Sequence, residues 1–286
     1  MSQSEFDFVV IGSGPAGQKA AVAAAKLGKK VAIVDRSVML GGVSVHTGTL
    51  PAKTLREAIL HLTGFTQRTF YGQDYAVKQN ISVQDLGFRV KGLVQHETEL
   101  IRSQLKRNGI TIFDGLGQFV DPHTIGVTND QGTTHIKGEY ILIACGTRPA
   151  HNPNIPFDGK RIVDTDQLTN AETLPRKAIV VGAGVIGLEY SSFLAALGVE
   201  VILIEQRPTI LDFVDHEIVE ALMYHLREIG TTFRLGEKVS SVGIDAQRNE
   251  VFAELESGKR VHGDCLLYAV GRQANSDQRR IALSRR

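Results

Sequence analysis

The sequence contains few cysteines, and this scarcity excludes several kinds of site. Cys145 and Cys265 are the only two, and they lie far apart in the apolar runs ILIACG and DCLLYAV. Two such cysteines are typical of buried small hydrophobic side chains and exclude a disulfide framework or a cysteine-based metal site; no metal site is expected. This usage of cysteine predicts a protein of the reducing cytoplasm.

An excess of one charge and long apolar runs are also absent. The 32 Lys and Arg residues balance 31 Asp and Glu residues, so neither nucleic acid nor a membrane surface is an expected partner. No apolar run approaches the ~18 residues that a spanning helix needs. The polar start, MSQSEFD, does not resemble a signal peptide.

Glycine, in contrast, is abundant. The chain has 29 glycines in 286 residues and 42% hydrophobic residues, which is typical of an α/β protein with many tight turns. Its length predicts about two domains.

The first glycine-rich motif follows Phe6–Ile11, an apolar run that predicts a buried strand. Glycines at such a turn allow close approach of the backbone to a pyrophosphate, and the helix that follows offers its N-terminal amides to the phosphates. The next strand, Val31–Val34, ends at an acid that can accept hydrogen bonds from ribose hydroxyls. These features predict a dinucleotide site formed by Gly12, Gly14, Pro15, Ala16, Gly17, Asp35 and Arg36.

The same pattern returns in the second half of the chain. Four of its positions recur 170 residues later, as Gly182, Gly187, Gly198 and Glu205. The repeat predicts a second dinucleotide site, formed by Gly182, Gly184, Val185, Ile186, Gly187, Glu205 and Arg207.

The acid at the end of this second unit bears on the choice of dinucleotide. Glu205 favours a free ribose 2′-hydroxyl, and hence NAD over NADP. Arg207 lies two residues further on and is either a phosphate ligand for NADP or a solvated loop arginine. We therefore expect NAD to be accommodated and leave NADP open.

The segments between the two motifs predict a mixture of helices and strands. Helical spacing of apolar residues appears at 54–66 and at 91–108. Short alternating runs predict a small antiparallel meander over 110–143, which ends in a buried strand at 140–144. Residues 151–158 contain prolines and are typical of a linker.

Further short runs predict more strands within 232–261 and a buried one at 265–270. The fold class that we expect is α/β, with two Rossmann-like domains that have parallel sheets and small antiparallel meanders. The expected parts of the chain are a first domain at 1–150, a second at 151–271, and an aberrant or truncated tail at 272–286.

A further stretch, Leu40–Lys53 (LGGVSVHTGTLPAK), lies between the first unit and an apolar helix. Its glycine pair, Gly41 and Gly42, its proline and its closing Lys53 predict a loop and a helix start built against a ligand.

Taken together, these motifs resemble the two-dinucleotide flavoprotein disulfide reductases, the class I pyridine nucleotide-disulfide oxidoreductase family. The resemblance is strongest to its soluble, Si-specific transhydrogenase branch. It rests on GSGPAG (12–17), LGG…GTLPAK (40–53), ILIACGTRP (141–149), GAGVIGLE (182–189) and LLYAVGRQAN (266–275).

The resemblance implies FAD at the first site and NAD(P)(H) as substrate at the second, with hydride passing between nicotinamide and flavin. It implies that Lys53 lies beside the flavin and pairs with Glu189, and that both take part in catalysis. It also implies cofactor contacts for Gly41, Gly42, Ser44, Thr49, Gly146, Arg148 and Gly271.

The family's chains continue with a second flavin-contacting motif and a dimerisation domain. Full-length members are therefore expected to form homodimers, whereas this chain resembles a C-terminally truncated member.

Two positions depart from the main pattern of the family. Most members have cysteines where this chain has Ser44 and Thr49, and hydroxyl groups cannot form the disulfide that relays electrons to a substrate. The resemblance then implies hydride transfer from NADPH to NAD⁺ through the flavin. Two alternatives stay open: a diaphorase that only oxidises NAD(P)H with dyes or quinones, and a non-catalytic truncated member.

Overall fold

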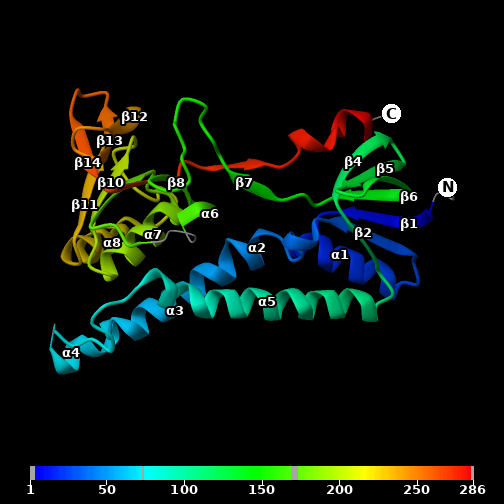
Figure 1. Ribbon diagram of the computed structural model, residues 1–286, viewed down its shortest axis with the longest axis horizontal. Helices are drawn as coiled ribbons and strands as arrows, with labels where there is room; N and C mark the ends of the chain where they lie inside the picture. Colours follow the sequence, from blue (N-terminus) through cyan, green and yellow to red (C-terminus); the bar gives the residue numbers. More distant parts are fainter. Residues whose placement is uncertain (1–3, 73, 169–172, 285–286) are drawn as a thin grey trace. The chain divides into compact units, whose positions relative to one another are not determined.

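The computed structural model describes residues 4–72, 74–168 and 173–284, and these form two compact units (Figure 1). The first unit contains the chain up to Ala52, residues 91–148 and the chain from Gln273 onward. The second contains residues 53–90 and 149–272. The domain boundaries expected at residues 150 and 271 stay predictions. The compact units group residues 53–90 with the second half, and the last segment with the first.

The first unit is built on a mixed six-stranded sheet. In spatial order its strands are β3 (Thr111–Asp114), β2 (Val31–Asp35), β1 (Ser4–Ile11), β6 (Gly132–Ile143), β5 (Thr124–Asn129) and β4 (Leu116–Asp121). The neighbours β3, β2, β1 and β6 are parallel, whereas β6, β5 and β4 are antiparallel.

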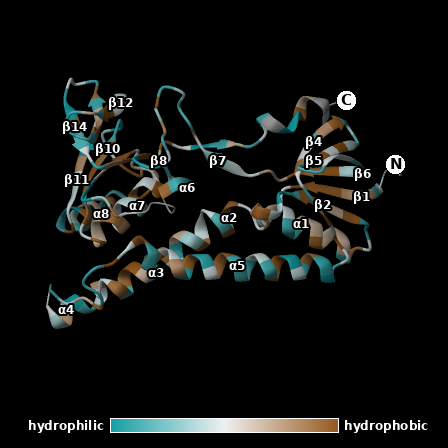
Figure 2. Cartoon of the chain, in the orientation of Figure 1, coloured by the Kyte–Doolittle hydropathy of each residue, from teal (hydrophilic) through white to brown (hydrophobic). Residues whose placement is uncertain are grey.

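Side chains on both faces of this sheet are buried, as alternation along β1 shows. Val9 and Ile11 pack on one face against Phe119 and Ile125 of the antiparallel strands. Val10 packs on the other face, in a cluster with residues of the helices. Figure 2 shows the resulting concentration of hydrophobic residues along β1 and β2. A core on each face explains why FDFVVI is almost continuously apolar.

Helices of the first unit cover the second of these faces. α1 (Pro15–Lys26) contributes Ala21, and the 25-residue α5 (Val83–Arg107) contributes Ile101 and Leu105. Proline at the first position of α1 is favoured because its missing N–H would have no helical partner. The remaining helical segments of this unit are short: η1 (Ser37–Met39), α2 (Val43–His46), η3 (Asp277–Arg279) and η4 (Ile281–Ser284).

The second unit is built on a parallel five-stranded sheet. In spatial order its strands are β11 (Thr231–Leu235), β10 (Glu200–Glu205), β9 (Lys177–Val181), β15 (Cys265–Tyr268) and β8 (Ile162–Asp164). A three-stranded antiparallel sheet accompanies it: β12 (Val239–Asp245), β13 (Glu250–Leu255) and β14 (Arg260–Gly263). Val242 and Val251 of the small sheet pack against Ile179 and Ile204 of the large one, so the two sheets share a core.

The helices of the second unit are α3 (Thr49–Leu62), η2 (Phe65–Gln67), α4 (Arg68–Tyr71), α6 (Thr165–Leu168), α7 (Val185–Ala196) and α8 (His216–Glu228). α3 and α5 each contain residues of both units. A two-stranded sheet pairs β7 (Thr147–Pro149) with β16 (Arg272–Ala274). No helix among the described residues is long and apolar enough to cross a bilayer.

The α/β class is confirmed, and four local expectations need correction. β3 pairs in parallel with β2 and is not part of an antiparallel meander. The strand expected to be buried at 140–144 is partly exposed, because Tyr140 is 65% exposed and Ile143 37%. The long helix begins eight residues before the expected 91, at Val83. The expected linker, 151–158, buries Ile155 in the core of the second unit.

Candidate functional site

The first glycine-rich loop connects β1 to α1 and leaves the N-terminus of α1 open. Gly12 has φ +106°, and a Cβ at this position would collide with the carbonyl oxygen of Ala144. A Cβ at Gly17 would collide with the carbonyl oxygen of Gly12, whereas the space beside Gly14 is empty. No side chain caps α1 and its first turn has no acidic residue. The loop therefore has the geometry that would hold an anionic group, as we predict for a pyrophosphate.

Asp35 at the end of β2 holds this loop in place. Its Oδ2 accepts hydrogen bonds from the backbone N of Ser13 at 2.7 Å and from the Ser13 hydroxyl at 2.6 Å. Its Oδ1 accepts from Arg36 N at 2.9 Å. The Ser13 hydroxyl also accepts from Gly41 N at 3.0 Å. The carboxylate that we expected to bind ribose thus also ties the loop to the Leu40–Lys53 stretch through Ser13, a residue that sequence reasoning missed.

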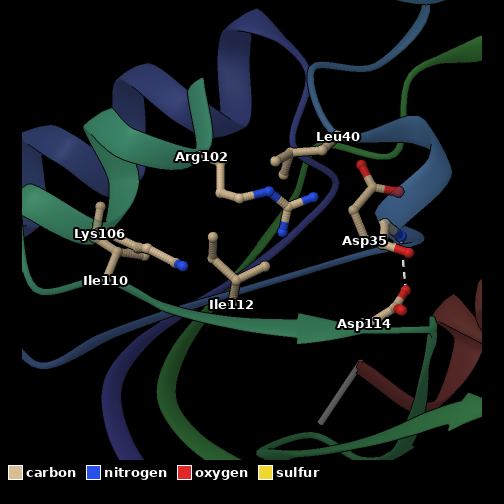
Figure 3. A pocket seen from close by; sticks show the side chains of 8 residues that line it. Asp35, Leu40, Arg102, Lys106, Ile110, Ile112 and Asp114 are labelled. Carbon is tan, nitrogen blue, oxygen red and sulfur yellow. Dashed lines mark hydrogen bonds between the residues drawn. The ribbon is translucent and has the colours of Figure 1, made fainter. Parts of the chain in front are cut away.

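A pocket of about 290 Å³ opens beside Asp35 (Figure 3). Arg102 and Lys106 of α5 extend into it from one side, over the apolar Ile112, and Asp35 and Asp114 lie on the other. The aspartates end adjacent strands in register, which explains their proximity. Sequence reasoning missed both cations. The only signal for them is their i, i+4 spacing on the amphipathic helix, which puts them on the same face.

The Leu40–Lys53 stretch lies directly against the first loop. Gly42 has φ +67°, and a Cβ there would come within 2.9 Å of the Cα of Gly14. The expected loop contains the short helix α2, and α3 begins at Thr49. His46 Nε2 lies 2.9 Å from the carbonyl oxygen of Leu40, which gives the imidazole a structural role.

The hydroxyl groups of this stretch differ in their partners. The Ser44 hydroxyl donates to Gly41 O at 3.2 Å, and Thr49 is exposed at the start of α3. The Thr47 hydroxyl is buried without a hydrogen-bond partner, although a buried polar atom normally has one. The two free cysteines lie elsewhere, and Cys145, which we expected to be buried, is partly exposed.

The second glycine-rich loop, between β9 and α7, repeats the geometry of the first. Gly182 lies against the backbone of Ala269, and a Cβ at Gly187 would collide with Gly182 O. The space beside Gly184 is empty, and α7 has neither a side-chain cap nor an acidic residue in its first turn. This loop therefore has the same geometry, which would hold a second anion.

Glu205 occupies the position of Asp35 in the second unit but makes different contacts. Its side chain is 6% exposed, and it accepts from Ala183 N at 2.8 Å and from Arg207 N and Nε at 3.0 and 3.1 Å. Burial raises the pKa of Glu205, but the hydrogen bonds from Arg207 and Ala183 outweigh it and bring the pKa below its usual value. Arg207 also lies 3.5 Å from Asp212, so this arginine, which the sequence left open between a phosphate ligand and a loop residue, has two acidic neighbours.

A pocket of about 200 Å³ adjoins the second loop on its other side. Gly184, Val185, Ile186 and Gly271, all predicted from the sequence, contribute to its lining. The other lining residues come from the ends of β7, β8, β15 and β16: Pro149, Thr165, Tyr268, Ala269 and Arg272.

The two residues predicted to take part in catalysis, Lys53 and Glu189, lie in the same compact unit. Burial raises the pKa of Glu189, against the smaller lowering effects of the Lys53 and Arg56 charges. The ion pairs of the described residues do not include a Lys53–Glu189 pair. Their proposed pairing therefore stays a prediction, supported by the effect of the Lys53 charge on the carboxyl group.

Arg148, a predicted FAD contact, has protein partners in this structure. Its guanidinium donates to both carboxylate oxygens of Asp277, at 3.0 and 2.8 Å, and to Asn275 Oδ1 at 3.1 Å. Gly146 O accepts from Asn275 N at 3.0 Å. These bonds fasten Arg148 of β7 and the loop before it to the segment after β16, so the expected aberrant tail makes specific contacts within the first unit. Among the described residues, no group of three or more His, Cys, Asp or Glu side chains is arranged to hold a metal ion.

Comparison with known proteins identifies the architecture. Residues 6–285 match the protein family described as pyridine nucleotide-disulphide oxidoreductase. This chain belongs to that family. The family consists of oxidoreductases that bind nicotinamide dinucleotides, which agrees with the repeated loops and uncapped helices.

Similar curated proteins include the soluble pyridine nucleotide transhydrogenases of Mycobacterium bovis and Colwellia psychrerythraea. The first is 49% identical over 276 residues, which are 96% of this chain and 58% of that protein. The second is 36% identical over 279 residues, 97% of this chain and 59% of that protein. The chain thus spans less than two thirds of the length of these relatives.

Two similar solved structures agree with the fold. One is a Cu(II) complex of the HOCl-induced flavoprotein disulfide reductase RclA from Escherichia coli, with TM-score 0.84 and 26% identity over 99% of this chain and 60% of that chain. The other is LpdA from Mycobacterium tuberculosis, with TM-score 0.85 and 27% identity over 96% of this chain and 60% of that chain.

Proposed function

We propose that this chain provides the two dinucleotide sites of an FAD-dependent transhydrogenase, which transfers hydride between NADPH and NAD⁺. FAD is proposed for the first loop and the nicotinamide dinucleotides for the second. The observation that carries the proposal is the pair of similar loops, each with an uncapped helix and an acidic residue at the end of the following strand.

The stretch against the first loop supports FAD as its occupant. Gly42 brings the stretch against Gly14, and the Thr47 hydroxyl of the stretch is buried without a hydrogen-bond partner. Asp35 would accept from ribose, and Arg102 and Lys106 would place positive charge near the adenosine half. The bound flavin supplies the hydride acceptor and donor.

The residues beside the proposed flavin favour exchange between nicotinamides over disulfide reduction. Ser44 and Thr49 have hydroxyl groups, and a thiolate is the species that attacks or forms a disulfide. The Lys53 ammonium is proposed to stabilise negative charge that develops on reduction. Glu189 is proposed to hold that lysine in place.

Transfer of reducing equivalents between two nicotinamides tests the proposal. The chain is supplied with FAD, and NADPH is mixed with an NAD⁺ analogue whose absorbance shifts on reduction. We expect the analogue to be reduced without added thiol. Dihydrolipoamide with NAD⁺ is expected to give no turnover, because the thiol relay is absent.

Two other outcomes would contradict the proposal. If a flavin-loaded sample reduces a dye or quinone with NADPH but never the NAD⁺ analogue, the diaphorase alternative replaces it. If the chain does not bind FAD, the non-catalytic alternative replaces it.

A further inference from the structure

A histidine–aspartate pair lies beside the second site and has no part in the function proposed above. His151 Nε2 donates to Asp164 Oδ2 at 2.6 Å. The Asp164 side chain is 7% exposed at the end of β8, whereas that of His151 is 49% exposed. A nearly buried carboxylate needs a partner, and His151 provides it for this oxygen.

The other carboxylate oxygen of Asp164 accepts hydrogen bonds from backbone amides at the start of α6. Asp164 Oδ1 accepts from the backbone N of Asp166 and of Gln167, both at 2.9 Å. The Gln167 side chain in turn accepts from Asp164 N at 3.1 Å, which completes a capping box. The carboxylate is thereby held in one orientation, with Oδ2 directed at His151.

Aromatic contacts connect His151 with the pocket of about 200 Å³ described above. The His151 ring stacks on Phe157, with centroids 4.2 Å apart and planes 15° apart. Phe157 meets Tyr268 edge to face at 5.8 Å. Tyr268 lines the pocket, as does Thr165, which follows Asp164. The pair therefore supports the wall of the pocket that faces the glycine-rich loop.

The strand order shows which half of a dinucleotide this wall would meet. The order is β11-β10-β9-β15-β8, and the glycine-rich loop follows β9. Glu205, at the end of β10, marks the adenosine side of the loop. The pocket extends to the opposite side, over the ends of β15 and β8, where the nicotinamide half would lie.

We infer that His151 and Asp164 are positioning residues for the nicotinamide half of the bound dinucleotide. Asp164 fixes the imidazole, the imidazole fixes Phe157, and Phe157 fixes the Tyr268 side of the pocket. This inference rests on the proposed function, because it assumes a nicotinamide dinucleotide at the second loop.

Binding measurements with whole and partial ligands test it. NADH, NADPH and ADP are titrated against the wild-type chain and His151→Ala. ADP has the adenosine half and the two phosphates but lacks nicotinamide. We expect the variant to bind NADH and NADPH about tenfold more weakly, because the pocket wall loses its support, and to bind ADP as the wild type does.

Two further variants separate the contacts of His151. His151→Gln keeps an N–H donor for Asp164 but has no ring, and His151→Phe keeps an aromatic ring that can stack on Phe157 but has no donor. Each is expected to recover part of the lost NADH affinity. His216→Ala, at a side chain 79% exposed on α8, is the matched control and should leave all three affinities unchanged.

Two results would overturn the inference. One is unchanged NADH affinity in His151→Ala, and the other is an equal loss of ADP affinity, which would indicate a general structural role. Failure of the wild-type chain to bind NADH, NADPH and ADP is a different result and contradicts the proposed function itself.

Discussion

The Ser13 hydroxyl donates to Asp35 Oδ2 at 2.6 Å, a contact that has no equivalent in the second unit. There, alanine occupies the position of Ser13, and the carboxylate of Glu205 reaches Ala183 N directly at 2.8 Å. The shorter Asp35 accepts from both the backbone and the hydroxyl of Ser13, and the same hydroxyl accepts from Gly41 N. The Ser13 hydroxyl thus joins the first loop to the Leu40–Lys53 stretch, whereas Ala183 has no hydroxyl group for such a bond.

Ser13→Ala should loosen this junction. The substitution leaves the buried Gly41 N–H without its partner, and we expect a loss of roughly 1 to 3 kcal/mol in unfolding free energy. FAD affinity should fall about tenfold. Denaturant unfolding and flavin fluorescence titration measure these effects. Ser241→Ala, which removes a 3.0 Å hydroxyl–carboxylate bond to Glu254 in the small sheet, should leave FAD affinity unchanged.

Glu189→Gln should change the pH dependence of stability. Because burial raises the pKa of Glu189, the folded chain holds its proton more tightly than the unfolded chain does. The protonated Glu189 thus contributes to stability. This contribution is complete below pH 4.5, the ordinary pKa of a glutamate, and is lost as the pH rises through the raised pKa of Glu189. A glutamine does not ionise, so the variant should match the wild type in acid and melt at a higher temperature near neutral pH. A melting difference that stays constant across pH would contradict this expectation.

Arg207→Gln should lower the affinity for NADPH more than the affinity for NADH. Its guanidinium lies 3.1 Å from the buried Glu205, and without it that carboxylate would repel a 2′-phosphate. We expect NADPH affinity to fall about tenfold, with NADH affinity changed less than about twofold. Competitive titration measures both, and Arg227→Gln on α8 is the control. Equal losses for the two ligands would mean that Arg207 is not a phosphate ligand.

The two cysteines should differ in reactivity towards a thiol reagent. Burial raises the pKa of Cys265 to about 12, so almost none of it is thiolate near pH 8, whereas Cys145 is partly exposed. We expect one rapidly reacting thiol in the native chain and two after denaturation. Cys145→Ser should abolish the rapid reaction, and Cys265→Ser should leave it unchanged.

Local patterns predicted most of the elements but only part of the candidate site. The glycine spacing, the apolar strands and the acids at the strand ends are features of short stretches of sequence. Both glycine-rich loops accordingly have the predicted geometry. The same patterns failed for β3, whose parallel pairing with β2 depends on the helical crossover between them. They also failed at Tyr140, because an apolar run does not reveal whether another element covers it.

Residue identity at short spacing predicts the two strand–glycine loop–helix units and places hydroxyl groups, not thiols, at Ser44 and Thr49. Only the folded chain shows that Ser13 joins the first loop to Gly41, that Arg102 and Lys106 lie in one pocket with Asp35, and that His151 meets Asp164. In the first two cases residues far apart in the chain come together, and in the third the expected linker meets a strand end. Strand order and helix crossing bring such groups together, and no local pattern encodes them.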